Sequence, residues 1–305
     1  MASVSSLEEA SAALQSAHAE GRRVRIGEDL TADSLTRILE HDPGDQTCTV
    51  EAGVRLSDLQ TALAASGQRL SLDPPGDPTI GALLAENLSG PLRHRCGTPR
   101  DLVLGATLVL GDGTIASSGG KVVKNVAGYD LARLVCGSQG RLAFVARASF
   151  RLHPLPRASA TVVVESDDPA GVVAGLLGSQ LQPSALDVLQ PGRVAVLFEG
   201  SRRAVTAQVE EARALVGGAE ADTSVWDESR ERQVGATGRV PFAPGDLARI
   251  LETLTDAVIR PSAGVAYTRH PSASDNLSQA FFGSPAQALV ERIRRELDPR
   301  GVLGG

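Results

Sequence analysis

The residues best suited to chemistry lie in one short stretch, Pro74–Gly90, which reads PPGDPTIGALLAENLSG. A turn rich in proline, glycine and aspartate runs into Thr79-Ile80-Gly81, and a short apolar helix is expected to follow. The stretch presents backbone N–H groups, two hydroxyls and the amide of Asn87, and its glycines let the backbone approach a flat or charged group closely. This composition suits a cofactor cradle better than a hydrophobic core.

A second glycine-rich stretch covers Gly119–Val145, GGKVVKNVAGYDLARLVCGSQGRLAFV. Gly128-Tyr129-Asp130 precedes a short predicted helix, Gly137–Gly140 ends it, and Arg141–Leu152 is an apolar run that predicts a buried strand. Either stretch alone has a plain structural explanation, because glycine-rich turns usually serve only to change the direction of the chain.

Four segments together resemble a known family, the flavin domain of the vanillyl-alcohol oxidase class, also called the PCMH-type FAD-binding domain. They are LDPPGDPTIGALLAENLSGP at 72–91, RDLVLGATLVLGDG at 100–113, GGKVVKNVAGYDLARLVCGS at 119–138 and QGRLAFVARASFRLHPLP at 139–156. Within that class the sequence is most similar to the smaller flavin-binding subunit, the E subunit, of bacterial glycolate oxidase. The resemblance is strong over residues 48–156 and weakens toward both ends.

The resemblance implies a non-covalent FAD, because the histidine or cysteine attachment motifs of covalent relatives are not present around His94 or elsewhere. Clustered N–H groups would neutralise the two phosphates and hydrogen-bond the carbonyl edge of the ring. No catalytic residue and no metal ligand is implied. The implied cofactor contacts are Pro75, Gly76, Asp77, Pro78, Thr79, Ile80, Gly81, Asn87, Ser89, Gly90, Gly140, Arg141, Leu142 and Val145.

The sequence departs from this family at the first phosphate-binding loop. Relatives carry a run such as Arg-Gly-Gly-Gly, whereas this chain has Arg25-Ile26-Gly27-Glu28-Asp29 and a shortened connection. A carboxylate near a pyrophosphate repels it by about 1 kcal/mol per pair in water, and by more when buried. Two possibilities stay open: the carboxylates weaken FAD binding, or they point outward and a neighbouring arginine compensates.

Several candidate residues have a structural explanation beside the functional one. Thr79 and Asp130 can cap helices at their N-termini, and Asn87 can end one. Tyr129 suits either the core or the ring pocket. Lys121 and Lys124 suit either solvent or an anionic group. Cys96 is expected to be a small buried residue.

Two groups of residues in this sequence could bind an anionic substrate. Arg93, Arg95 and Arg100 cluster in the chain, and they could attract a 2-hydroxy acid, dock a partner or form a solvated basic loop. Tyr267 and Arg269-His270 are a weaker candidate, for the group that the second domain would place over the flavin. No Ser-His-Asp, zinc-ligand or phosphate-loop arrangement is present.

Bulk composition excludes some functions. The net charge of −6 argues against a general nucleic-acid binder, and the spacing of the three cysteines matches no metal or redox motif. No signal peptide is visible, and no apolar run approaches the roughly 20 residues that span a bilayer. We therefore expect a reduced, cytoplasmic chain that reaches the inner membrane, if at all, through partners.

The chain of 305 residues predicts two α+β domains with a boundary near Pro154–Pro156. Residues 1–155 would form the two-part PCMH-type FAD-binding domain. Residues 156–305 would form an α+β substrate or cap domain, ferredoxin-like at least in part, because strand, helix, strand, strand and helix follow one another. Ala243–Val258 and Pro285–Leu297 are predicted helices, 219–233 a polar surface stretch and Leu35–Leu39 a helix or turn.

Three functions are compatible with this sequence. The first is an FAD-dependent oxidoreductase subunit that oxidises a small, glycolate-like 2-hydroxy acid. It would pass electrons to a larger flavin subunit and an iron–sulfur subunit, because three cysteines are too few for a cluster of its own. The second is a structural or regulatory subunit with weak or no flavin. The third is another FAD oxidoreductase of the same fold, such as the cell-wall enolpyruvyl reductase or the flavin subunit of molybdenum hydroxylases.

Overall fold

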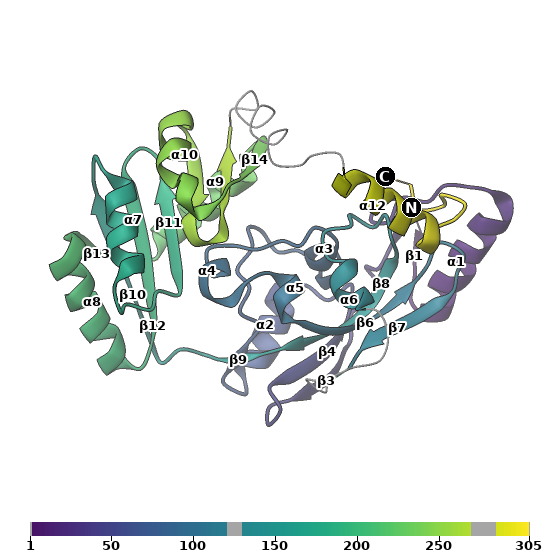
Figure 1. Ribbon diagram of the computed structural model, residues 1–305. Helices are drawn as coiled ribbons and strands as arrows, with labels where there is room; N and C mark the ends of the chain where they lie inside the picture. Colours follow the sequence, from purple (N-terminus) through teal and green to yellow (C-terminus); the bar gives the residue numbers. More distant parts are fainter. Residues whose placement is uncertain (1, 121–129, 270–284, 305) are drawn as a thin grey trace.

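The computed structural model describes residues 2–120, 130–269 and 285–304, and these form two lobes, each with its own antiparallel sheet. Figure 1 shows the first lobe on the right, in purple and blue, and the second on the left, in teal and green. The chain passes from one to the other after β9 (His153–Pro154), and the first strand of the second sheet in the sequence, β10, begins at Ala158.

The first lobe is built on a five-stranded sheet with the order β3-β4-β8-β6-β7. Its central strand, β8, divides two hydrophobic cores, since successive side chains of a strand point to opposite faces. Phe144 and Ala146 pack with α1, whereas Val145 packs with α2 and α3. The strands are β3 (Ile38–Asp42), β4 (Thr47–Glu51), β6 (Val103–Val109), β7 (Ile115–Gly119) and β8 (Phe144–Arg151).

Helices and short strands complete this lobe. The longest helix, α1, begins after Ser6, whose hydroxyl accepts a hydrogen bond from the Glu9 N–H at 3.1 Å, and ends at Gly21 with φ 65°. The helices are α1 (Leu7–Glu20), α2 (Leu56–Ala64), α3 (Ile80–Ala85), α4 (Arg93–Cys96), α5 (Pro99–Leu102) and α6 (Leu131–Leu134). The short strands are β1 (Ala2–Ser3), β2 (Leu30–Thr31) and β5 (Gln68–Arg69), and β5 pairs with β9.

The second lobe is built on a seven-stranded sheet with the order β13-β10-β12-β11-β15-β16-β14. Its first four strands with α7 and α8 have the ferredoxin-like order, so the predicted fold class is confirmed here. The strands are β10 (Ala158–Glu165), β11 (Ala185–Leu189), β12 (Arg193–Gly200), β13 (Ala219–Ala221), β14 (Gly238–Pro241), β15 (Ala257–Arg260) and β16 (Val265–Thr268). The helices are α7 (Pro169–Gly178), α8 (Arg202–Val216), α9 (Ser224–Val234) and α10 (Leu247–Thr253), with short 3₁₀ turns at Pro244–Asp246 and Pro261–Ala263.

This sheet contains the same strand–helix–strand–strand unit twice. The units β10-α7-β11-β12 and β14-α10-β15-β16 each place their third strand between the other two, and they meet where β11 pairs with β15. The helix predicted over Ala243–Val258 is too long, because α10 ends at Thr253 and Val258 and Ile259 are fully buried in β15. Two adjacent β-branched residues suit a buried strand better than a helix.

Two further elements differ from the prediction. The polar stretch 219–233 contains the helix α9, which lies on the face of the sheet opposite α7 and α8 and is anchored by the buried Trp226. The Trp226 indole N–H donates to the Thr161 hydroxyl at 2.9 Å. The segment predicted as a helix or turn at Leu35–Leu39 contains no helix, and its last two residues, Ile38 and Leu39, belong to β3, which pairs with β4.

The C-terminal segment returns to the first lobe. After α12 (Pro285–Leu297), Val302 and Leu303 are buried in the core that α1 forms, and Leu303 pairs with Val24. The buried carboxylate of Asp298 accepts the backbone N–H groups of Val302 and Leu303, each at 2.8 Å. The sheet of the second lobe thus ends at Thr268, and Figure 1 shows α12 in yellow over the first lobe.

Candidate functional site

A cavity of about 510 Å³ lies in the first lobe, between the loop after α1, the start of α3 and the turn before β8. Its volume falls within the roughly 300–1,000 Å³ that is usual for small-molecule and cofactor sites. The lining residues are Ile26, Gly27, Leu30, Thr31, Ala32, Asp33, Arg55, Pro78, Thr79, Gly81, Ala82, Ala85, Glu86, Ser138, Gln139, Gly140, Ala143, Phe144 and Val145.

Residues 25–30, here called the opening loop, form a tight turn at this cavity, and ion pairs within the loop hold it together. Gly27 has φ 90° and donates its N–H to the Leu30 carbonyl at 2.9 Å. The Arg25 guanidinium pairs with Glu28 at 2.5 Å and with Asp29 at 3.3 Å, and these bonds lower the pKa of Asp29. Gly27 and Leu30 line the cavity, whereas the side chains of Glu28 and Asp29 are 62% and 43% exposed and lie outside it. The structure therefore agrees with the second possibility, in which the carboxylates point outward and an arginine neutralises them.

The second wall is the turn that leads into α3. The Ile80 N–H donates to the Val54 carbonyl at 2.9 Å and the Gly81 N–H to the Ala52 carbonyl at 2.7 Å, which fixes the turn against the end of β4. The Thr79 hydroxyl accepts from the Ala82 N–H at 3.3 Å and so caps α3 while its residue also lines the cavity. A Cβ at Gly81 would lie 3.2 Å from Ala52, so a side chain there would crowd this contact.

The third wall is the turn Ser138–Gly140. Gln139, with φ 54°, donates its N–H to the Ala85 carbonyl at 2.7 Å and joins the turn to the end of α3. Gly140 has φ 73°, and a Cβ there would come within 2.7 Å of the Ile26 Cβ. Glycine is required at this position, because the turn and the opening loop touch there and together close one end of the cavity.

Five of the fourteen sequence-derived contacts line this cavity, namely Pro78, Thr79, Gly81, Gly140 and Val145. Pro75 and Gly76 instead face α9, Asp77 accepts from the Ser57 N–H at 2.9 Å and caps α2, and Ile80 is fully buried in the core. Asn87, with φ 51°, follows α3 and accepts from the Arg100 N–H at 3.2 Å. Arg141 is exposed, Leu142 packs on the core, and Ser89 and Gly90 lie at the junction of the lobes.

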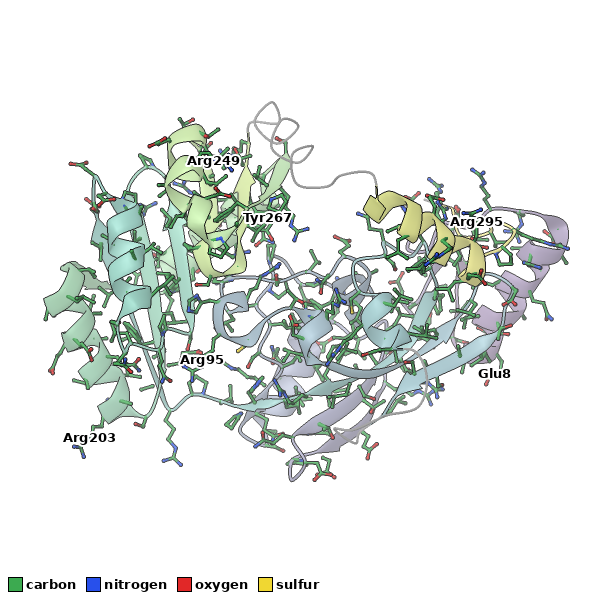
Figure 2. All side chains as sticks on the ribbon, in the orientation of Figure 1. Glu8, Arg95, Arg203, Arg249, Tyr267 and Arg295 are labelled. Atoms are coloured by element: carbon green, nitrogen blue, oxygen red, sulfur yellow. The ribbon has the colours of Figure 1, made fainter. Side chains whose placement is uncertain are left out.

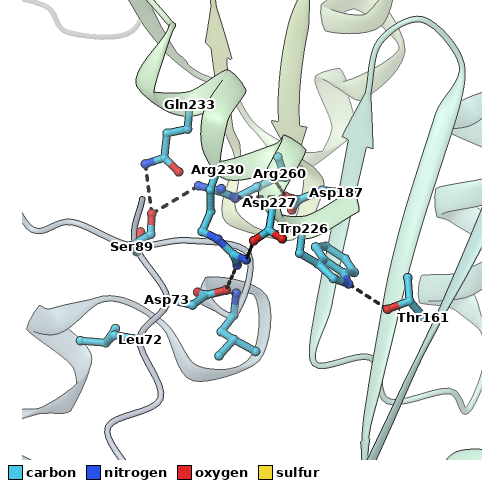
Figure 3. Close-up of polar contacts among 12 residues, drawn as sticks. Leu72, Asp73, Ser89, Thr161, Asp187, Trp226, Asp227, Arg230, Gln233 and Arg260 are labelled. Atoms are coloured by element: carbon cyan, nitrogen blue, oxygen red, sulfur yellow. Dashed lines mark hydrogen bonds and ion pairs between the residues drawn. The ribbon is translucent and has the colours of Figure 1, made fainter. Parts of the chain in front are cut away.

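Hydrogen bonds to the Ser89 carbonyl join the two lobes. This carbonyl accepts from Gln233 Nε2 at 3.1 Å and from Arg260 Nη1 at 3.4 Å. Figure 3 shows these bonds between the first lobe and the elements α9 and β15. A Cβ at Gly90 would lie 1.8 Å from the Asp73 carbonyl, so only glycine lets the two turns of the flavin motif lie against each other.

Charged side chains are buried at the same junction. Arg260 is 1% exposed, lies 3.5 Å from the fully buried Asp187, and stacks on the Tyr267 ring at 5.1 Å. Its Nε is the atom that faces Asp187, and its Nη2 has no hydrogen-bond partner among the described residues. Asp73 accepts from Arg230 at 3.4 Å, and burial raises the pKa of Asp73 to about 7. Such a site has guanidinium donors to spare for an anion.

The arginines that the sequence grouped together are separated in the structure. Arg93 is half-buried near Tyr267, and burial lowers its pKa, with Arg239 and Arg260 adding to the shift. Arg95 lies where the first lobe faces the second and donates to the Gln182 carbonyl at 3.2 Å (Figure 2). Arg100 is exposed, and Arg269 is 57% exposed beside Asp256. Lys121, Lys124, Tyr129 and His270 lie outside the described residues.

Sequence reasoning did not select several lining residues. Thr31, Asp33 and Arg55 have no motif of their own. Thr31 and Asp33 follow the opening loop, whose Ile26 pairs with Leu30, and Arg55 lies at the cavity because its backbone pairs with that of Thr79. Position gives the only sequence signal for Arg55, since it directly precedes Leu56, Leu59 and Leu63, which recur at the spacing of a helix.

The residues of the cavity fit FAD. Ala82, Ala143 and Phe144 provide an apolar surface for a flat ring, and Thr31, Ser138 and Gln139 provide polar groups. A Cβ at Gly27 would meet nothing within 4 Å, so this turn leaves open space at the mouth of the cavity. Within the described ranges no group of three or more potential metal ligands is found. None of the described helices is both long and apolar enough to cross a membrane.

Comparison with known proteins supports an FAD site independently of the cavity. The model of the family described as a FAD binding domain matches residues 27–119, from the opening loop to the end of β7. The chain is 35% identical over 237 residues to the glycolate oxidase subunit GlcE of Escherichia coli, covering 75% of this chain and 64% of that protein. It is 34% identical over 168 residues to the glycolate oxidase subunit GlcD of Bacillus subtilis, covering 53% and 36%.

A further relative is the mitochondrial D-lactate dehydrogenase [cytochrome] 1 of Saccharomyces cerevisiae, 31% identical over 57% of this chain and 30% of that protein. Less than two thirds of each of these relatives is therefore covered. Among solved structures, alkyldihydroxyacetonephosphate synthase matches with a TM-score of 0.74 at 15% identity, over 98% of this chain and 75% of the other. That likeness concerns the fold of both lobes.

Proposed function

We propose that this chain, whose residues 27–119 match the model of a FAD binding domain, is the flavin-binding subunit of an oxidoreductase acting on a small 2-hydroxy acid. The observation that carries the proposal is the 510 Å³ cavity, whose walls come from the opening loop, the Thr79–Gly81 turn and the Ser138–Gly140 turn. Those turns carry the motifs that led to the family from the sequence. Residues in these three walls would hold FAD without a covalent bond.

The opening loop supports a retained cofactor site. Arg25 neutralises Glu28 and Asp29 outside the cavity, so the carboxylates that replace the usual glycines do not face a bound pyrophosphate. Gly27 and Gly140 line the cavity and carry no side chain, which allows close approach of a ligand to their backbone. The alternative of a purely structural subunit with no flavin thus loses the feature that first suggested it.

The class of substrate is argued from the junction of the lobes. Arg260 and Arg93 lie there beside Ser89, and the buried Nη2 of Arg260 has no hydrogen-bond partner among the described residues. A planar guanidinium binds carboxylates well, and a buried one binds them more strongly than an exposed one. These residues would bind and orient the carboxylate of a 2-hydroxy acid and exclude water from it. Bound FAD would supply the two-electron acceptor for the oxidation.

A partner must take the electrons onward in this proposal. The cysteines Cys48, Cys96 and Cys136 are free and lie on separate elements, which supports the view that an iron–sulfur cluster would belong to another subunit. The resemblance to glycolate oxidase subunits E and D supports a complex with a larger flavin subunit and an iron–sulfur subunit.

The test is the absorbance spectrum of the purified full chain before and after denaturation, followed by turnover assays. We expect a flavin spectrum whose chromophore is released into the supernatant by denaturation. We expect little turnover of glycolate or D-lactate by the chain alone, and more after co-expression with the two partner subunits. No flavin in the chain while the complex stays active would move the assignment to a structural subunit. Strong turnover by the isolated chain would contradict the dependence on partners.

A further inference from the structure

The charges that line the cavity are few in the part of the chain that the structure describes. They are those of Asp33, Arg55 and Glu86, so Arg55 is the cation of the described wall. Arg25, which is close in sequence to the opening loop, is bound by Glu28 and Asp29 and lies outside the cavity. A dinucleotide carries two phosphates, and in a site with two carboxylates it needs a positive group close by.

The structure holds Arg55 in a defined position at the mouth of this cavity. Arg55 is the residue before α2, its backbone pairs with that of Thr79, and its Nη1 donates to the Asp77 carbonyl at 2.7 Å. The carboxylate of Asp77 is engaged elsewhere, since it accepts from the N–H and the hydroxyl of Ser57 at 2.9 and 2.8 Å. Arg55 is thus anchored by a neutral carbonyl, which orients its guanidinium without neutralising its charge.

We infer that Arg55 binds the diphosphate of the cofactor and supplies the neutralisation that the shortened opening loop does not. The inference rests on the proposed flavin site and adds a residue to it that no motif identifies. A guanidinium presents five N–H donors in a planar fork, so one bond to the Asp77 carbonyl still allows a bidentate contact with phosphate. The N-terminus of α2 is not available for this role, because Asp77 already caps it.

The test is a titration of the flavin-free full chain with FAD and, separately, with riboflavin, followed by the quenching of flavin fluorescence. Riboflavin has the ring and the ribityl chain but no phosphate. We expect Arg55→Gln to weaken FAD binding roughly 10- to 100-fold, the effect of losing a charge-assisted hydrogen bond, and to change riboflavin binding less than about threefold. Arg55→Lys keeps the charge without the fork and is expected to give a smaller loss.

Glu28→Gln is the control, because it changes a charge on the opening loop whose side chain lies outside the cavity. It should leave the Kd for FAD within about twofold of the parent chain. An unchanged Kd for FAD in Arg55→Gln would overturn the inference, and so would an equal loss for FAD and riboflavin, which would indicate a disturbed fold. If the parent chain binds no FAD, the proposed function fails first, and the inference fails with it.

Discussion

At the scale of single residues, Gly140 is the position where sequence, backbone and cavity agree most closely. Its φ is 73°, and an added Cβ would lie only 2.7 Å from the Ile26 Cβ, which leaves no room for a larger residue. We expect Gly140→Ala to reduce flavin content and to lower stability by about 1 kcal/mol or more, because the backbone conformation is strained and the opening loop is displaced. Flavin per chain and urea denaturation measure the two effects.

Gly178→Ala is the control for this substitution. Gly178 lies at the end of α7, and a Cβ there would meet nothing within 4 Å. It should leave flavin content unchanged and stability the same or slightly higher, because alanine favours a helix more than glycine does. Equal flavin content in both variants would show that Gly140 does not help to form the cofactor site.

Asp73, at the junction of the lobes, makes the stability of the protein depend on pH. Burial raises its pKa to about 7 from an ordinary value of 3.8, so the folded protein binds a proton that the unfolded chain has already released. Between about pH 4 and pH 7 the folded state therefore binds more protons than the unfolded state. The contribution of Asp73 to stability falls as the pH rises through this window.

We expect Asp73→Asn to flatten this dependence, because an amide oxygen can still accept the Leu92 N–H but does not titrate. Thermal denaturation of both chains from pH 4 to pH 8 provides the measurement. The difference in midpoint between the variant and the parent chain should be smallest near pH 4 and should shift in favour of the variant toward pH 8. A difference that does not vary with pH would contradict the raised pKa.

At the scale of the elements, the C-terminal segment stabilises the first lobe. Leu303 is fully buried among the residues of the α1 core and pairs with Val24, two residues before the cavity begins at Ile26. We expect Leu303→Ala to cost about 2–5 kcal/mol of unfolding free energy, the usual cost of a buried leucine. Flavin content should fall as well, because the opening loop loses its neighbour.

Leu177→Ala provides the comparison, since that leucine is 47% exposed on α7. Its cost should stay below about 1 kcal/mol, with flavin content unchanged. Chemical denaturation of both variants, with flavin content measured alongside, decides the matter. If Leu303→Ala were no more destabilising than Leu177→Ala, the C-terminal segment would not belong to the core of the first lobe in solution.

The elements show how far sequence reasoning reaches. Thr79 and Asp130 cap the helices that follow them, as their residue types predicted, and an apolar run predicted the buried strand β8. Local patterns failed where a long-range partner decides the structure. The sequence of α9 is mostly polar, so no local pattern marks it as a packed helix. It is held in place by its one buried aromatic residue, Trp226, which packs on a sheet face formed by strands distant in sequence.

In the candidate site, too, some features have a local sequence signal and others depend on distant segments. The glycine turns of the cavity have a sequence signal, because glycine at positive φ or at a close contact is a local requirement. The orientation of Glu28 and Asp29 has none, because it depends on the side chain of Arg25 rather than on residue type. Arg55 and Arg260 also had no local signal, since their importance comes from the segments that fold against them.

At the scale of the whole molecule, the second lobe is an insertion between two parts of the first. The chain leaves the first lobe after β9, and Val302 and Leu303 lie again in its core. Limited proteolysis near Leu155, which is 40% exposed between β9 and β10, should therefore cut the chain without separating the lobes. We expect both fragments to elute together from a sizing column and to separate only in denaturant.

The lobes are also joined by side chains across their interface, and these support the same expectation. Arg69 donates to both carboxylate oxygens of Glu199, at 2.8 and 2.6 Å, close to the crossing point of the chain. Independent elution of the two fragments in native buffer would contradict the inserted arrangement.

The returning C-terminal segment also sets the order of events during synthesis on the ribosome. Val302 and Leu303 are translated after every strand of the second lobe, yet they complete the core beside the opening loop of the cavity. The second lobe can fold while the chain is still being made, but the first lobe stays incomplete until these residues emerge. Cofactor capture therefore depends on residues that are translated late, and a nascent chain stalled before Val302 should not retain flavin.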